Sequence, residues 1–328
     1  MTICLGIEST AHTIGVGIFD SRKKKVLANE RKTFPESGIH PRKAADFQSE
    51  EFGGVFNSAL ERAGVELNDV DIVAFSQGPG LGACLRISCV AARALALMCG
   101  KPVVGVNHCV AHIEISKFMT GAKDPLVVYV SGGNTQIIVG QKERRGSIRG
   151  LRYHVIGETL DTGIGNFLDV FAREIGEKDA RDVERLASQG RNFIQLPYTV
   201  KGMDLIFGGL LTESIKKFKE GVDKENLCFS VQETAYSMLC EAAERALALT
   251  GKKEVVVCGG VAQNRRLQTM LKIVANDWGC KFGVAPNEFN GDNGAMIAYV
   301  GCLLGKKRTL KLREIIPIQK FRTDAFVI

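Results

Sequence analysis

The sequence predicts an α/β protein in which one arrangement of strands and helices occurs twice. Three short strands followed by alternating helices and strands are predicted in each half of the chain. A small polar turn at 9–12 and glycine-rich turns at 78–82, 131–135 and 259–260 follow strands. Such a repeat indicates two related α/β domains. We expect domains at residues 1–124 and 125–328, the second with a C-terminal tail, and a cleft between the two.

The elements of the first half follow from local patterns. Apolar runs at 3–8 and 13–19 predict two strands joined by a small polar turn. Pro41, a residue favoured at the first position of a helix, opens a helical pattern over 41–63. The other elements expected here are strands at 26–28, 71–75 and 103–106, a helix at 83–98, and a helix that follows residue 107.

The second half repeats this order. Its expected strands are 126–130, 136–139, 153–156, 254–258 and 281–284, and its expected helices are 161–175, 226–249, 262–276 and 292–304. The basic stretch 142–152 is expected to connect a hairpin. Ligands of open α/β sheets bind beyond the carboxyl ends of strands, so the glycine turns predict a phosphate or nucleotide site. A single Gly-Gly pair is commonly only a tight turn.

Composition is that of a globular protein in a reducing compartment. Hydrophobic residues make up 45% of the 328 residues and charged residues 24%, and ten cysteines are scattered without a C-x-x-C pair. The N-terminus is typical of a strand and lacks signal-peptide features, and we expect no apolar run of membrane-spanning length. We therefore predict a cytoplasmic protein without membrane association. The net charge of +7 is compatible with RNA as a partner.

Two of the five histidines are four residues apart, at His108 and His112. On a helix this spacing places both imidazoles on one face, where they can share a metal ion. The alternative is a pair of buried histidines bonded to backbone carbonyls. Because Cys109 and not Glu follows His108, the pair is not a zinc-protease motif.

Ordered motifs run through nearly the whole chain. They lie at residues 6–8, 10–13, 76–82, 105–114, 129–136, 157–161, 201–204, 259–262, 292–298 and 321–324. Together they resemble the universal tRNA threonylcarbamoyltransferase family, most closely its archaeal and eukaryotic branch, the catalytic subunit of the KEOPS complex. The resemblance implies a duplicated actin-like ATPase (RNase H-like) fold.

The resemblance also implies a metal site. In this family the two histidines bind one divalent ion, iron or zinc, together with the aspartate of a D-N-G motif and a tyrosine. The matching residues here are His108, His112, Asp292 and Tyr129. Asp292 opens a predicted helix, so an ordinary N-cap is the alternative role for this carboxylate.

A nucleotide site is implied in the same way, for threonylcarbamoyl-adenylate, ATP or AMP. Its residues would be Tyr129, Val130, Ser131, Gly132, Gly133, Asp169, Glu184 and Asn264. Glycines let backbone N–H groups approach a phosphate closely. The family's Pro-Gly-Gly-Pro segment is replaced here by residues 177–181, so we predict that Lys178 or Arg181 contacts the phosphate instead.

The implied activity is transfer of a threonylcarbamoyl group to a tRNA adenine next to the anticodon. The implied partners are tRNA and KEOPS-type subunits, including a small protein kinase/ATPase-like subunit and a small dimerising subunit. Two basic stretches, 142–152 and 306–313, are candidate tRNA contacts. The alternatives are a catalytically weakened scaffold, a small-molecule kinase, in which the histidine pair has no role, and a peptidase, for which Glu114 is misplaced.

Overall fold

The computed structural model describes residues 2–35, 40–145 and 148–328, and the side chains of residues 144–149 lie outside this description. Contacts divide the chain into two units. Unit 1 comprises Met1–Phe118, Gln141–Tyr153 and Pro286–Ile328, and unit 2 comprises Met119–Gly140 and His154–Ala285. The domain boundary expected between residues 124 and 125 stays a prediction.

Two five-stranded sheets share one topology. The first has the order β3-β2-β1-β4-β5 and the second the order β12-β11-β6-β7-β8. In both, the first strand along the chain is central, antiparallel to the second strand and parallel to the fourth. The strands are β1 Ile3–Glu8, β2 Thr13–Asp20, β3 Lys25–Thr33, β4 Ile72–Gly78, β5 Val103–Asn107, β6 Leu126–Val130, β7 Thr135–Arg145, β8 Ile148–Glu158, β11 Glu254–Cys258 and β12 Lys281–Val284. The predicted duplication of the α/β pattern is therefore confirmed.

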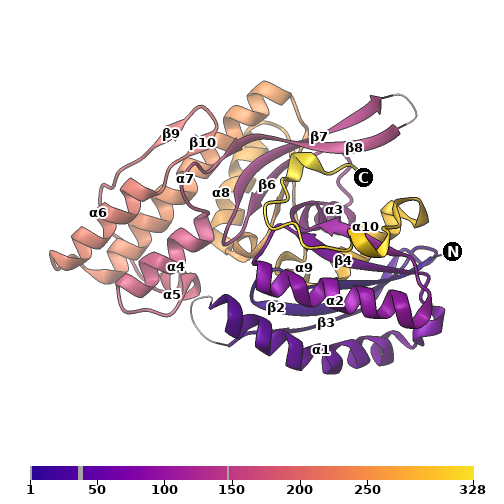
Figure 1. Ribbon diagram of the computed structural model, residues 1–328. Coiled ribbons are helices and arrows are strands. Elements are labelled where there is room, and N and C mark those ends of the chain that lie inside the picture. Colours follow the sequence, from indigo (N-terminus) through magenta and orange to yellow (C-terminus); the bar gives the residue numbers. More distant parts are fainter. Residues whose placement is uncertain (1, 36–39, 146–147) are drawn as a thin grey trace. The chain divides into compact units, whose positions relative to one another are not determined.

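Helices cover both faces of the sheet in unit 1 (Figure 1). Leu5 and Ile7 of β1 point to the face occupied by α1 (Pro41–Ala63) and α2 (Gly82–Cys99). Gly6, whose side of the strand is the opposite one, lies directly against the backbone of α10 (Gly294–Leu304). Because residues alternate between the two faces of a strand, Gly6 faces α10, and its missing side chain lets the helix approach the sheet at backbone distance.

Replacing Gly17 by alanine is expected to destabilise the protein strongly. An added Cβ would overlap backbone atoms of Gly294 and Ala295, which cannot move aside as a flexible side chain can. We expect a loss of about 3 kcal/mol or more in the free energy of unfolding. The matched control is Gly53→Ala in α1, where a Cβ meets nothing within 4 Å and helix propensity favours alanine by about 0.5–1 kcal/mol. Urea titration measures both, and equal midpoints would contradict the expectation.

In unit 2 the central strands pack against a group of helices. The core combines β6 and β11 with the largely buried helix α7 (Lys224–Thr250). The other helices of this unit are α4 Ile164–Glu174, α5 Ala180–Ala187, α6 Gly208–Lys219 and α8 Arg265–Asp277, with the two-stranded ribbon β9 Val200–Lys201 and β10 Asp204–Leu205. Remaining short elements are α3 His108–Thr120 and α9 Asn287–Asn290, and the 3₁₀ turns Leu67–Asp69, Gly260–Gln263, Lys306–Arg308, Leu312–Glu314 and Thr323–Ala325.

Several expected elements have other bounds in the structure, and two of these differences bear on the candidate sites. The basic stretch 142–152 does not form only a connection, because β7 extends to Arg145 and β8 begins at Ile148. The helix expected from residue 161 begins at Ile164, because Asp161 accepts hydrogen bonds from the N–H groups of Phe207 and Gly208. The local apolar pattern predicts neither the extension of these strands nor the hydrogen bonds that Asp161 makes with a distant segment.

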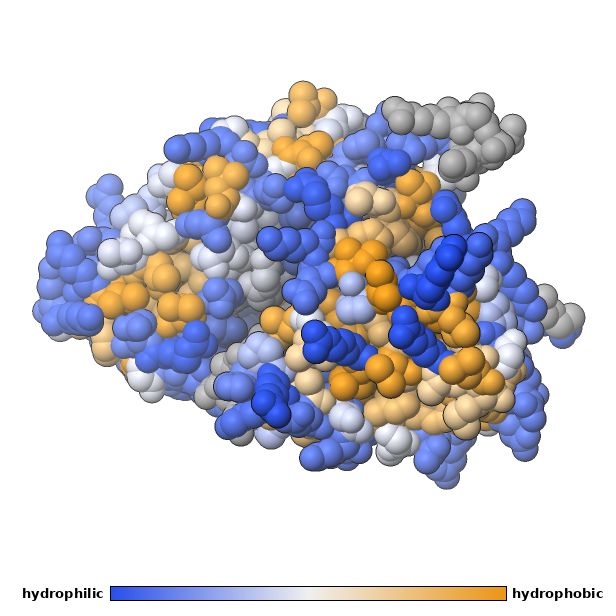
Figure 2. Space-filling model, viewed as in Figure 1, coloured by the Kyte–Doolittle hydropathy of each residue, from blue (hydrophilic) through white to orange (hydrophobic). Residues whose placement is uncertain are grey.

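The expectation about apolar runs also needs correction. Among the described residues, α2 is long and apolar enough to cross a membrane by length and composition alone. One face of α2 packs in the core of unit 1, and core helices can pass the same test. Its other face exposes Val90 by 65%, Leu97 by 70% and Met98 by 78%, and apolar surface is visible in this area in Figure 2.

Candidate functional site

The two histidines of the H-x-x-x-H pattern lie on one face of α3. The helix begins at His108, directly after β5, and the two ring centroids are 4.7 Å apart with an interplanar angle of 89°. Both side chains are buried. The predicted helical placement of the pair is therefore confirmed.

Asp292 joins the histidines from a distant part of the chain. Its Oδ1 is 3.2 Å from Nε2 of His112 and 3.5 Å from Nε2 of His108. One ligand atom from each of these three residues lies within 4.8 Å of the other two, an arrangement that could hold a metal ion. Two imidazoles and a carboxylate without a thiolate suit iron or zinc, so the donor set fits the metal that the resemblance implies.

Asp292 is not the N-cap of the helix that follows it. That position belongs to Asn293, whose Oδ1 accepts a hydrogen bond from the Met296 N–H and whose amide group donates to the carbonyl oxygens of Phe289 and Gly291. Because Asn293 caps α10, the carboxylate of Asp292 is left to face the histidines. The alternative role considered for Asp292 is excluded by this arrangement.

Side chains of β3 hold the loop that carries Asp292. Arg31 donates hydrogen bonds at 3.2 Å to the carbonyl oxygens of Glu288 and Asp292. Asn29 accepts from the Ala295 N–H at 3.3 Å, in the first turn of α10. These contacts fix the backbone on both sides of the carboxylate and were not expected from the sequence.

Glu8 was also missed as a site residue, although its place at the end of β1 could have indicated it. Its side chain is fully buried, and Oε2 lies 3.1 Å from Nδ1 of His108. Thr10 donates to the other carboxylate oxygen at 2.5 Å. A carboxylate on Nδ1 holds the proton there and directs Nε2 of the same ring toward a metal. Glu8 is thus positioned to orient His108.

The two histidines have opposite protonation tendencies. Burial lowers the pKa of His108, but the carboxylates of Glu8 and Asp292 raise the pKa to about 9. Burial and the neighbouring His108 charge lower the pKa of His112, opposed by its bond to Asp292. Burial alone would raise the pKa of Asp292, yet the two histidines hold it well below its usual range. Without a metal, the positive charge of a protonated His108 therefore offsets part of the negative charge of these carboxylates.

Tyr129, the fourth expected ligand, belongs to unit 2. It is fully buried at the carboxyl end of β6, opposite Cys258 of β11. Gly259 follows with φ at +97°, and a Cβ there would overlap the carbonyl oxygen of Val130. Glycine is required at this position because no other residue fits both the conformation and the space. The role of Tyr129 as a ligand stays a prediction.

The expected phosphate loop follows β6 and is attached to the start of α4. The carbonyl oxygens of Ser131 and Gly132 accept from the N–H groups of Gly165 and Asn166. The Ser131 N–H already donates to Asn134 at 2.8 Å, so it is committed within the loop. Gly132 and Gly133 are exposed, and a Cβ on either would meet nothing within 4 Å. These two glycines are the part of the loop open to a ligand.

The other expected nucleotide residues lie on three helices of unit 2. Asn264 is buried, caps α8 through the Leu267 N–H and donates to Gln232 of α7. Glu184 of α5 accepts from the N–H of Arg265, the residue after Asn264, at 3.3 Å. The structure therefore brings Glu184 and Asn264 together, whereas Asp169 of α4 accepts from the Ala180 N–H at the start of α5.

Residues 177–181, which replace the family's Pro-Gly-Gly-Pro segment, include charged side chains that form ion pairs with nearby residues. Arg181 contacts Asp179 through two of its nitrogens, and its side chain is 84% exposed. Lys178 is exposed as well. Contact of either residue with a phosphate stays a prediction, and Arg181 would have to leave Asp179 to make it.

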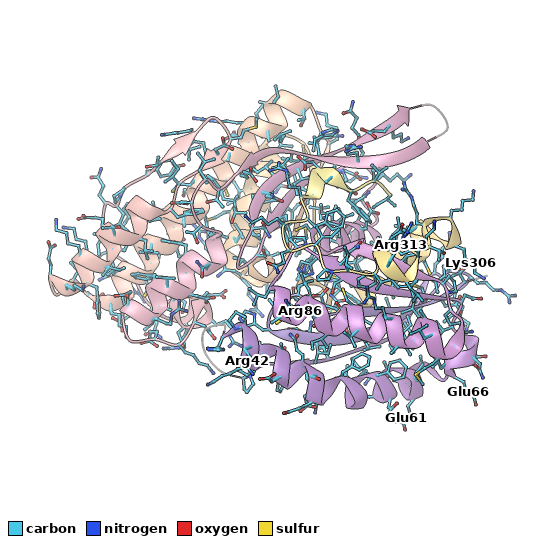
Figure 3. The ribbon with its side chains drawn as sticks, in the orientation of Figure 1. Arg42, Glu61, Glu66, Arg86, Lys306 and Arg313 are labelled. Atoms are coloured by element: carbon cyan, nitrogen blue, oxygen red, sulfur yellow. The ribbon has the colours of Figure 1, made fainter. Side chains whose placement is uncertain are left out.

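The two basic stretches differ in the exposure and ion pairing of their basic side chains. The exposed basic residues of the second stretch are Lys306, Lys307, Arg308, Lys311 and Arg313, of which Figure 3 labels Lys306 and Arg313. In the other stretch Lys142 is exposed, but Arg152 binds Glu143 and the carbonyl oxygen of Asp324. Arg144, Arg145 and Arg149 of that stretch have side chains outside the described part of the chain.

Comparison with known proteins gives a family and close relatives. The family model described as tRNA N6-adenosine threonylcarbamoyltransferase matches residues 23–299. A protein of that name from Thermococcus kodakarensis is 52% identical over 328 residues, covering 98% of each chain. A "probable bifunctional tRNA threonylcarbamoyladenosine biosynthesis protein" from Methanosphaera stadtmanae is 47% identical and is covered over 59% of its own length.

Solved structures support the fold at much lower identity. Component A of the (R)-2-hydroxyglutaryl-CoA dehydratase from Acidaminococcus fermentans superposes with a TM-score of 0.59 at 16% identity, over 92% of this chain and 98% of that one. This neighbour and others with actin-like ATPase architecture confirm the predicted fold class. At this identity the likeness concerns the fold alone.

Proposed function

Because this chain belongs to the tRNA N6-adenosine threonylcarbamoyltransferase family, we propose that it transfers the threonylcarbamoyl group of threonylcarbamoyl-adenylate to tRNA. The acceptor is the exocyclic amine of the adenine next to the anticodon, in tRNAs that read ANN codons. The amine nitrogen bonds to the carbonyl carbon, the bond to the phosphate oxygen breaks, AMP leaves, and the amine loses one proton.

One observation of the structure carries this proposal: the convergence of His108, His112 and Asp292 behind the buried carboxylate of Glu8. A scaffold has no need for three ligand-type side chains, two of them buried histidines, to converge on one point. A divalent iron or zinc ion held by these residues would supply Lewis-acid polarisation of the threonylcarbamoyl oxygen. Tyr129 is proposed as the fourth ligand.

The residues of unit 2 are proposed to hold the adenylate. The backbone of Gly132 and Gly133 is suited to the phosphate, since exposed glycines let their amide groups approach an anion closely. Tyr129, Val130 and Ser131 form the strand end beside them. Asp169, Glu184 and Asn264 are the proposed contacts to the ribose and base. The donor is already a mixed anhydride, so orientation of the two reactants is the main requirement and no covalent nucleophile is needed.

We further propose that the protein works in the cytoplasm as the metal-dependent catalytic subunit of a KEOPS-type complex. Its partners would be a small protein kinase/ATPase-like subunit and a small dimerising subunit. A relative whose name describes a bifunctional protein extends beyond the part that this chain matches, which supports cooperation with a second activity. The alternative is a catalytically weakened scaffold, favoured by the replaced glycines at residues 177–181.

Transfer activity tests the proposal directly. The protein, with its partner subunits, is incubated with iron or zinc, threonylcarbamoyl-adenylate and an ANN-reading tRNA transcript, and the modified nucleoside is quantified after digestion. A transcript with guanine in place of the acceptor adenine is the control, and it should remain unmodified. Metal and nucleotide binding without any transfer would favour the scaffold.

Neutralising the basic turn before the tail is expected to weaken tRNA binding. The triple variant Lys306→Gln, Lys307→Gln, Arg308→Gln removes exposed charges. Each lost phosphate contact should reduce the slope of log K against log salt by about 0.7–0.9. The matched control neutralises Lys216, Lys217 and Lys219 of α6. Equal salt slopes for the two triple variants would place the RNA surface elsewhere.

A further inference from the structure

The C-terminal tail, residues 310–328, is attached along the ends of the strands that lead to the histidine helix. The N–H of Leu310 donates to Val103 of β5, and the N–H of Ile318 donates to Gln77 of β4 at 2.7 Å. Gln77 also donates to the carbonyl oxygens of Glu314 and Ile316. At its end the tail pairs with β8, where Leu151 and Ile328 exchange two backbone hydrogen bonds of 3.0 Å.

Asn107 lies at the point where this tail meets α3. It is the last residue of β5, directly precedes His108 and is fully buried. Its amide group donates to the carbonyl oxygens of Phe321 at 3.1 Å and Arg322 at 3.2 Å. Its Oδ1 accepts from the Val110 N–H at 3.1 Å, in the first turn of the helix. One side chain therefore binds the tail with its donors and caps α3 with its acceptor.

From this arrangement we propose that Asn107 is a positioning residue that couples the C-terminal tail to the metal-binding face of α3. Only a neutral amide satisfies both sides, because two carbonyl oxygens require a donor and the Val110 N–H requires an acceptor. Backbone hydrogen bonds fix the tail on both sides of this contact. The tail therefore restricts rotation of the Asn107 side chain. The orientation of His108 then depends on the tail. The inference rests on the proposed metal function of that cluster.

The decisive variant is Asn107→Asp. A carboxylate can still accept from the Val110 N–H but is repelled by the two carbonyl oxygens, so either the tail or the cap must be released. Phe326→Ala weakens the same attachment from the tail side, because the Phe326 ring packs on Phe321 with centroids 5.6 Å apart. Asn226→Asp is the matched control, since Asn226 in unit 2 uses Oδ1 to accept two N–H groups and a carboxylate can do the same.

Two measurements on the full chain test the coupling. In the metal-free protein, hydrogen exchange should accelerate both in the tail and in the first turns of α3 for Asn107→Asp. Titration with Co²⁺, followed by its visible absorption, should show about tenfold weaker binding for this variant, the size of effect usual for residues behind a metal ligand. Phe326→Ala should shift both readouts in the same direction, and Asn226→Asp should shift neither.

Faster exchange in the tail with unchanged exchange in α3 would overturn the coupling, as would parent-like Co²⁺ affinity in a variant whose tail is released. If Asn107→Asp does not fold, Phe326→Ala decides by the same two readouts. A parent protein that binds no Co²⁺ would refute the metal function, while the exchange comparison would still decide whether tail and helix are coupled.

Discussion

Replacing His112 by alanine is expected to abolish stoichiometric metal binding and transfer while the protein stays folded. The buried His112 supplies one of the three ligand atoms that cluster together among the residues the structure describes, and its Nε2 is 3.2 Å from Asp292. Loss of a direct ligand should cost more than the 10- to 100-fold typical of residues behind it, so we expect metal affinity to fall by at least about 100-fold. Elemental analysis and calorimetric titration measure this.

His112 is a better choice than His108 for this experiment. Removing His108 would leave the buried Glu8 carboxylate without the imidazole, and an uncompensated buried charge costs about 3–5 kcal/mol of stability. The burial-lowered pKa of His112 indicates a neutral side chain, so its removal should cost only about 1–3 kcal/mol. His154→Ala, a half-buried histidine of unit 2, is the control. Full metal occupancy in His112→Ala would show that these residues are not the ligands.

The repeated architecture could be predicted because it follows from local patterns in the sequence. Short apolar runs, periodic helices and glycine turns recur in the same order in both halves, and each sheet shows that order in its topology. The basic stretch 142–152 was misjudged because charge favours a loop, whereas a long hairpin pairs its backbone regardless of charged side chains.

Part of the candidate site was also predictable, and part was not. The spacing of His108 and His112 is a property of one helix, so the sequence contains it. Asp292 could be named only through resemblance to a family. Glu8 contacts a residue 100 positions away and Arg31 one 261 positions away, and no short-range pattern encodes such contacts. The supporting residues of the site are therefore visible only when the sheet and α10 are assembled.

Glu8→Gln is expected to change the pH dependence of metal binding more than any other single substitution in unit 1. With the pKa of His108 raised to about 9, a proton competes with the metal, so affinity should rise about tenfold per pH unit from pH 7 toward 9. Glutamine removes the carboxylate that contributes most to this raised pKa. The variant should bind metal about 10- to 100-fold more weakly at pH 9. The metal affinity of the variant should change much less with pH. The difference in affinity between the variant and the parent should therefore become smaller toward pH 7.

The metal-free protein offers an independent readout of the same interaction. A pKa raised in the folded state from 6.5 to about 9 stabilises the fold fully below about pH 6.5, and this stability is lost as the pH rises through about 9. The parent should therefore lose stability between these pH values, and Glu8→Gln should lose less. Glu114→Gln is the control, a buried carboxylate of α3 that pairs with Lys117 and should lower stability without altering the metal-binding slope. Parallel pH profiles for the parent and Glu8→Gln would mean that Glu8 does not set the protonation of His108.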